Sequence, residues 1–180
     1  MIESPQAVLD FWREAGPKKW FSKDAAFDDA IRARFLGTHE VAAADKLADW
    51  ETTPGGALAL VIALDQFPRN MFRGTARAFA SDPLARQVAD RAITKGFDRQ
   101  VPARERGFFY LPFMHSERFD DQERSVALYR ALGDAENLKY ANDHADIIRK
   151  FGRFPHRNAV LGRAATAEEQ AFLDRGGFAG

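Results

Sequence analysis

The stretch Asp121–Gly152, DQERSVALYRALGDAENLKYANDHADIIRKFG, decides the fold class. It predicts two helices, over about 121–132 and 136–151, and each of them is followed at once by a glycine. Glycine is the residue that most readily ends a helix, because it adopts the left-handed conformation without strain. Two helices joined by so short a loop must run antiparallel, so the stretch predicts a helix pair.

Residues that predict helix starts and helix ends recur along the rest of the chain. Starts are predicted at Ser4-Pro5, Thr53-Pro54, Asp82-Pro83, Pro102 and the capping box of Thr166–Glu169, and ends at Gly16, Gly37, Gly96 and Gly176. Separate helices are expected over about 23–35 and 39–50. Another helix should end as Phe67-Pro68 approaches, and Pro112 should truncate or kink a further one. Alanine occurs 31 times against 13 for valine and isoleucine together, which favours helix over strand. We therefore predict an all-α fold of eight or nine short helices in antiparallel pairs.

The apolar faces of these helices predict the core. The bulkiest clusters place the following side chains inside: Leu58, Ile62, Phe108, Phe109, Leu111, Ile147 and Phe151.

Length and composition limit the classes of protein. The chain has 180 residues and no linker, so we expect one domain over 1–180. The 26 basic and 26 acidic residues balance, which argues against a general nucleic-acid binder. There is no cysteine, no apolar run of about 18 residues and no basic-then-apolar leader. The expectation is a cytoplasmic protein without a membrane span.

The first polar segment is Leu64–Gly74, in which charged and amide side chains alternate with aromatic ones. Asp65 is a candidate general base, and the ligand-binding candidates are Gln66, Arg69, Asn70 and Arg73. The structural alternative is that Asp65 and Arg69, four residues apart, only pair at a helix end.

The second segment, 149–163, holds five fixed cations and no carboxylate. Helix-dipole complementarity explains the cations at the end of the preceding helix but not Arg157 and Arg163. Guanidinium groups bind phosphate and carboxylate well. The candidates for anion binding are Arg153, His156, Arg157, Asn158 and Arg163. Alternatively, these arginines pair with the acidic residues between Asp120 and Glu136.

The third segment, 109–117, places His115 and Glu117 on irregular backbone after Pro112. They could form a general-base pair, His156 being a further catalytic candidate, or two ligands of a metal completed by His144 or His156. The zinc-deaminase signature that begins with His-x-Glu needs a cysteine pair, which is absent. No nucleotide-binding glycine loop occurs, so we expect no cofactor. Because there is no cysteine and the four histidines are not spaced like a structural site, we also expect no metal.

Taken together, these segments resemble a bacterial family known as domain of unknown function 924. The matching motifs are Val8–Trp12, Gly16–Phe21, Leu64–Gly74, Glu105-Arg106, Phe108–Glu117, Phe151–Asn158 and Leu161–Arg163. One departure is Arg13, where an aromatic residue is expected. The resemblance implies a tetratricopeptide-like helical fold, and it implies no activity, substrate or cofactor.

Three functions from different classes fit these residues. The first is a binding domain whose arginine segments meet in one cleft, beside His115 and Glu117, and hold a small anion or a peptide carboxylate. The second is an enzyme, hydrolase-like, that uses Asp65, His115 or His156 as an acid or base in the same cleft. The third is a structural protein whose polar motifs only tie helix ends. Enzymatic activity and oligomeric state stay open.

We predict that the protein folds without metal, because it has no cysteine and its four histidines are not spaced like a structural site. Thermal melting with and without excess EDTA should give the same midpoint. A lower midpoint in EDTA would contradict this expectation.

Overall fold

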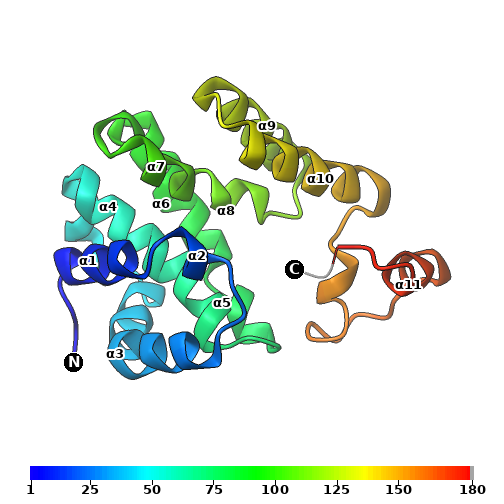
Figure 1. Ribbon diagram of the computed structural model, residues 1–180, viewed down its shortest axis with the longest axis horizontal. Coiled ribbons are helices and arrows are strands. Elements are labelled where there is room, and N and C mark those ends of the chain that lie inside the picture. Colours follow the sequence, from blue (N-terminus) through cyan, green and yellow to red (C-terminus); the bar gives the residue numbers. More distant parts are fainter. Residues whose placement is uncertain (179–180) are drawn as a thin grey trace. The chain divides into compact units, whose positions relative to one another are not determined.

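The computed structural model describes residues 1–178, and within that range it is helical with no strand (Figure 1). This confirms the all-α fold class. The chain divides into two compact units. Unit 1 comprises Met1–Arg73 and Arg77–Pro112, and unit 2 comprises Gly74–Ala76 and the chain from Phe113 onward.

Unit 1 contains seven of the labelled helices: α1 (Pro5–Ala15), α2 (Pro17–Trp20), α3 (Ala25–Ala43), α4 (Pro54–Val61), α5 (Phe67–Met71), α6 (Asp82–Thr94) and α7 (Ala103–Arg106). Short 3₁₀ helices cover Ala48–Thr52, Phe97–Gln100 and Gly107–Phe109, and a further one, Ala76–Phe79, belongs to unit 1 except for its first residue. The chain leaves unit 1 within α8 (Leu111–Met114). Helix α4 packs against α1 and α6, while α3 packs against α5.

The predicted first helix is confirmed at both ends. The Ser4 hydroxyl accepts a hydrogen bond from the Ala7 N–H, and Pro5 occupies the first turn, where its missing N–H costs nothing. Gly16, with φ of 73°, ends the helix while its N–H donates to the Trp12 carbonyl.

The core of unit 1 is aromatic. Trp12 is 1% exposed, and its ring lies 5.8 Å from Phe67, 5.6 Å from Phe108 and 5.9 Å from Trp20. All five predicted core residues of this unit are buried: Leu58, Ile62, Phe108, Phe109 and Leu111.

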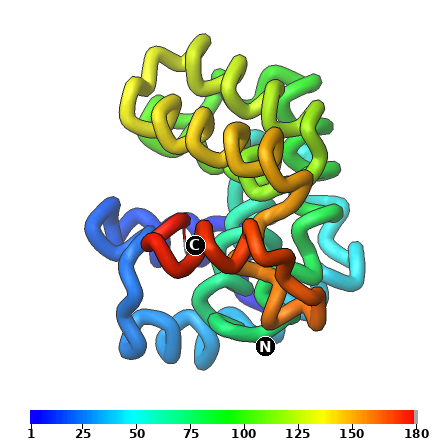
Figure 2. The backbone as a smooth tube through the Cα atoms, turned by 90° about the vertical axis from the view of Figure 1, so that its right-hand side faces the viewer, coloured from blue at the N-terminus to red at the C-terminus, as the bar shows by residue number. Residues whose placement is uncertain are grey.

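Unit 2 contains α9 (Phe119–Leu132), α10 (Ala135–Phe151), a 3₁₀ helix at Pro155–Arg157 and α11 (Ala167–Asp174). Helices α9 and α10 lie side by side and antiparallel in both views (Figures 1 and 2), as the sequence predicts. Gly133 and Gly152 end them in the left-handed conformation. The capping box of α11 is also present, with Thr166 and Glu169 bonding reciprocally.

The small core of unit 2 gathers around Ile147, Ile148 and Phe154. Ile147 is buried as predicted, but Phe151 is only partly buried. Phe151 is the last residue of α10, so its ring packs on one side, against Phe172 at 5.2 Å.

The predicted helix end at Phe67-Pro68 is wrong. A π-helical turn, Ile62–Gln66, joins α4 to α5 so that the helix continues through the proline. The Phe67 N–H donates to Ile62 O, which leaves the Ala63 carbonyl without its usual partner, and Pro68 has no N–H for Leu64 O.

Side chains from other elements bond these released carbonyls. His39 Nδ1 lies 2.9 Å from Ala63 O, and the Ser81 hydroxyl donates to Leu64 O at 2.6 Å. Arg69 donates to the next carbonyl, Asp65 O, at 2.7 Å. The turn therefore depends on partners that lie up to 24 residues away.

Other boundaries also differ from the sequence prediction. Helix α3 runs through Gly37 to Ala43, so the expected separate helix over 39–50 is its second half followed by a 3₁₀ turn. A β-carbon at Gly37 would meet Met1 O at 2.8 Å, so this glycine gives space to the N-terminus. Pro112 lies inside α8, and the chain from Ala103 to Met114 is split into short pieces. The described residues therefore form more helical segments than eight or nine.

Replacing Phe109 with alanine should lower the free energy of unfolding by about 3–5 kcal/mol, because the ring is fully buried. Denaturant unfolding measures the change, and Phe21→Ala is the matched control because Phe21 is 63% exposed. A loss below about 1 kcal/mol for Phe109→Ala would reject the assigned core.

Candidate functional site

The first polar segment forms a buried ion-pair network within unit 1. The Arg69 guanidinium donates to both Asp82 oxygens, at 2.8 and 2.9 Å, and lies 3.3 Å from Asp65 Oδ1. Gln66 Nε2 donates to the other Asp65 oxygen at 2.6 Å. Burial opposes the charge of Arg69, but the two carboxylates outweigh it and raise its pKa above the ordinary value.

The remaining polar residues of that segment contact α3. Asn70 Nδ2 donates to Asp28 Oδ1 at 2.7 Å, and Arg73 donates to both Asp28 oxygens at 2.9 and 3.0 Å. Asn70 and Arg73 therefore tie the end of α5 to the first turn of α3.

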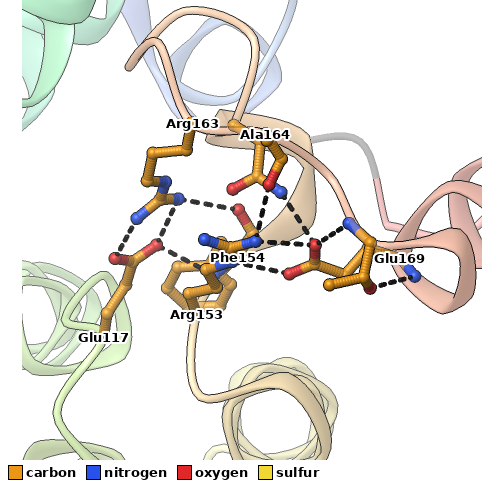
Figure 3. Close-up of polar contacts among 8 residues, drawn as sticks. Glu117, Arg153, Phe154, Arg163, Ala164 and Glu169 are labelled. Atoms are coloured by element: carbon orange, nitrogen blue, oxygen red, sulfur yellow. Dashed lines mark hydrogen bonds and ion pairs between the residues drawn. The ribbon is translucent and has the colours of Figure 1, made fainter.

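The polar segments of unit 2 meet at Glu117 (Figure 3). Arg163 donates to both carboxylate oxygens, at 2.7 and 2.9 Å, and the Phe154 N–H donates to Oε1 at 2.8 Å. Burial acts to raise the pKa of Glu117. The hydrogen bonds from Arg163 and Phe154, with the charges of Arg163 and Arg157, lower it below its ordinary value.

Glu169 is a further carboxylate of unit 2 that binds an arginine (Figure 3). Arg153 donates to its two oxygens at 2.6 and 2.8 Å, and Asn158 and the Thr166 N–H donate to Oε2. The hydrogen bond from Arg153 is the main reason why the pKa of Glu169 falls to about 2, although burial acts to raise it. Glu117 and Glu169 hold the loop after α10 at its two ends.

Two histidines contact aromatic rings beside this loop, in edge-on or tilted arrangements. The His144 ring lies 5.5 Å from Phe154 and 4.5 Å from Phe178, while His156 lies 5.6 and 5.1 Å from the same two rings. The guanidinium carbon of Arg157 lies 4.5 Å from the centre of the Phe154 ring.

The pKa of His144 depends on its burial and on the charges around it. Its pKa falls to about 4, first because it is buried and then because His115 and Arg157 repel the protonated ring. His144 Nδ1 bonds the Tyr140 carbonyl at 2.8 Å. We call His115, His144, His156 and Arg157 the histidine–arginine cluster.

One polar helix face was missed by the sequence prediction. Gln122, Ser125 and Tyr129 are each at most 1% exposed and form the buried face of α9. Gln122 Nε2 donates to Met114 O at 2.7 Å and to Ser116 O at 2.6 Å, on either side of His115. Polar residues at positions i, i+3 and i+7 of a helix are visible in a sequence, and such spacing is the signal that could have found this face.

The comparisons with known proteins agree with this fold. The model of a family described as bacterial protein of unknown function, DUF924, matches residues 8–177. The chain belongs to the DUF924 family. A solved structure of a protein of unknown function from Agrobacterium tumefaciens is similar to this chain, with 48% identity and a TM-score of 0.92. The match covers 95% of this DUF924 chain and 97% of the other. No curated protein matches.

The predicted site residues of this DUF924 member divide between the two units. Unit 1 holds Asp65, Gln66, Arg69, Asn70 and Arg73, and unit 2 holds His115, Glu117, Arg153, His156, Arg157, Asn158 and Arg163. Within each unit the structure brings the predicted residues together. A single cleft formed by both groups stays a prediction.

The ion pairs favour the structural interpretation for several arginines. Arg69, Arg73, Arg153 and Arg163 each bind a carboxylate. The partners of Arg153 and Arg163 are Glu169 and Glu117 rather than the acidic residues between Asp120 and Glu136, which the sequence suggested as an alternative. Arg13, the departure from the family pattern, binds the buried Glu105 at 2.8 and 2.9 Å.

Two absences concern residues 1–178. No group of three or more histidine, aspartate or glutamate side chains in that part of the chain is arranged to hold a metal ion. None of its helices is both long and apolar enough to cross a membrane.

The depressed pKa of His144 predicts how stability depends on pH. Below pH 6.5 the unfolded chain takes up a proton at this histidine, while the folded chain stays neutral down to about pH 4. The free energy of unfolding should therefore fall between pH 6.5 and 4, by on the order of 3 kcal/mol from this group.

Urea unfolding of the wild type and of His144→Gln across that range isolates the effect. The variant should lose less stability on acidification, while His39, whose pKa is also lowered by burial, contributes equally to both proteins. Parallel curves for the two proteins would show that His144 titrates normally.

Proposed function

We propose that the protein binds a small anionic ligand, a phosphate or carboxylate compound, at the histidine–arginine cluster of unit 2. The observation that carries the proposal is the environment of His144, whose protonation is opposed first by burial and then by the positive charges of His115 and Arg157. An anion at the cluster would offset this repulsion.

The fixed charges in this part of the chain support the proposal. Arg153 and Arg163 each use both oxygens of one carboxylate, so Glu169 and Glu117 are already engaged in bidentate pairs. Arg157 adds a third guanidinium close enough to lower the pKa of both Glu117 and His144. The neighbouring imidazoles can supply further hydrogen-bond donors.

Arg157 is well placed for recognition of an anion. Its side chain is 7% exposed overall and stacks on Phe154, so little conformational freedom remains to be lost when a ligand binds. A guanidinium presents several donors in one plane, which matches two oxygens of a phosphate or carboxylate group. The backbone beneath it is fixed by the Phe154 N–H bond to Glu117.

Catalysis is the second candidate function. His115 and His156 belong to the same cluster and could transfer protons to a bound ligand. Glu117 fits this function less well, because its oxygens accept from Arg163 and Phe154. Asp65 belongs to the Arg69 network of unit 1. We therefore place binding first, and the tetratricopeptide-like repeat, the peptide ligand and the cytoplasmic location stay predictions.

Thermal unfolding with inorganic phosphate tests the proposal. Phosphate that binds only the folded state must raise the melting temperature. At a free phosphate concentration of 100 times the dissociation constant, the folded state is stabilised by about 2.7 kcal/mol. Because phosphate also stabilises proteins nonspecifically, sodium chloride of equal ionic strength and a variant comparison are both required.

We expect Arg157→Gln to lose the phosphate-dependent shift that the wild type shows. Arg130→Gln is the matched control, because it removes the same charge from an exposed position of α9. An equal shift in wild type and Arg157→Gln would contradict the proposal. So would a loss of about 3–5 kcal/mol of stability in Arg157→Gln with no phosphate effect on the wild type, the result expected of a buried structural pair.

A further inference from the structure

The polar face of α9 carries two buried atoms that need hydrogen-bond partners. Gln122 Oε1 and Ser125 Oγ belong to side chains that are 0% exposed, and neither has a partner among residues 1–178. The two residues are three positions apart, so they lie next to each other on one side of the helix. Buried polar atoms without a partner are rare and costly, which makes a pair of neighbours informative.

The hydrogen bonds of Gln122 fix which end of its amide is which. Its nitrogen lies 2.7 Å from Met114 O, 2.6 Å from Ser116 O and 3.4 Å from Phe113 O. Carbonyl oxygens only accept, so the NH₂ group must face them and Oε1 must face elsewhere. The missing partner of Gln122 is therefore a donor, and Ser125 can either donate to it or accept from it.

Gln122 is also linked to the histidine–arginine cluster. The two carbonyls that it bonds most closely, those of Met114 and Ser116, flank His115 in the chain. The charge of His115 acts in turn on His144. The Gln122 side chain therefore bonds the backbone on both sides of one member of the cluster.

We infer that Gln122 and Ser125 bind a hydroxyl group of the ligand whose anionic group binds at the cluster. This inference rests on the proposed function and narrows it, because the ligand class becomes hydroxylated phosphates or hydroxy acids. A hydroxyl both donates and accepts, so it satisfies Gln122 Oε1 and Ser125 Oγ together.

Two probes of similar size test hydroxyl binding separately from anion binding. Glycerol 3-phosphate carries two hydroxyl groups, and propyl phosphate carries the same phosphate on a chain of equal length without them. Isothermal titration calorimetry gives the dissociation constant of each. We expect both to bind the wild type, and glycerol 3-phosphate to bind about tenfold more tightly, as expected for one or two added hydrogen bonds.

Ser125→Ala is the variant to compare, with Ser22→Ala in unit 1 as its control. Ser125 Oγ has no partner to lose, so the variant should fold with wild-type stability. It should bind propyl phosphate as before and prefer glycerol 3-phosphate by no more than about twofold. Ser22→Ala, whose hydroxyl bonds Lys19 O, should keep the full preference.

The possible outcomes are distinct. Equal binding of the two probes by the wild type would overturn the inference and leave the anion site standing, since a water molecule would then satisfy the two atoms. A preference that survives in Ser125→Ala would show that the hydroxyl binds elsewhere, which also overturns it. Failure of both probes to bind would remove the proposed function and the inference with it.

Discussion

Arginines that bind carboxylates far away in the chain are the constraint on which this structure depends. Buried or half-buried carboxylates are held by guanidinium groups 13 to 92 residues distant, as in Arg13–Glu105, Arg69–Asp82, Arg73–Asp28, Arg153–Glu169 and Arg163–Glu117. A carboxylate with low exposure is costly unless it is paired, so each bond fixes one pairing of distant segments. The short helices have few long apolar faces. The arginine–carboxylate pairs therefore add contacts that hold distant helices together.

The histidine–arginine cluster is a second feature of unit 2. Arg153 and Arg163 bind Glu169 and Glu117, while His144, His156 and Arg157 contact the ring of Phe154. Burial, together with the charges of His115 and Arg157, keeps the pKa of His144 near 4, and this costs stability below neutral pH. We propose that this arrangement serves binding, because a bound anion would offset the repulsion between these charges. The buried polar atoms of α9 extend this account from an anion to a hydroxylated anion.

Much of the fold could be predicted, because helix starts and ends are local. Ser4-Pro5, Gly16, Gly133 and the Thr166 capping box all act within a few residues, and the structure has them as the sequence indicates. The π-turn could not be predicted in this way. It depends on His39 and Ser81, which lie in distant parts of the chain and bond the carbonyls of Ala63 and Leu64. Pro68, taken alone, predicts a helix end.

In the candidate site too, local residue patterns could be predicted from the sequence, whereas contacts between distant segments could not. The arginine-rich segments were recognisable by composition, but their partners Glu117 and Glu169 lie 16 to 46 residues away, at distances that only the fold determines. The sequence suggests His144 only as a metal ligand, because its aromatic and cationic neighbours come from other segments. The polar face of α9 was within reach of the sequence, since Gln122 and Ser125 share a helical spacing.

The most direct measurement of the central claim is the pKa of His144, followed by NMR of the imidazole carbon-bound protons while pH is varied. Assignment uses the spectrum of His144→Gln. The account predicts a pKa near 4 in sodium chloride and a clear rise when inorganic phosphate replaces chloride at equal ionic strength, because a bound anion offsets the charges of His115 and Arg157. A pKa near 6.5 in chloride, or one that phosphate leaves unchanged, would contradict it.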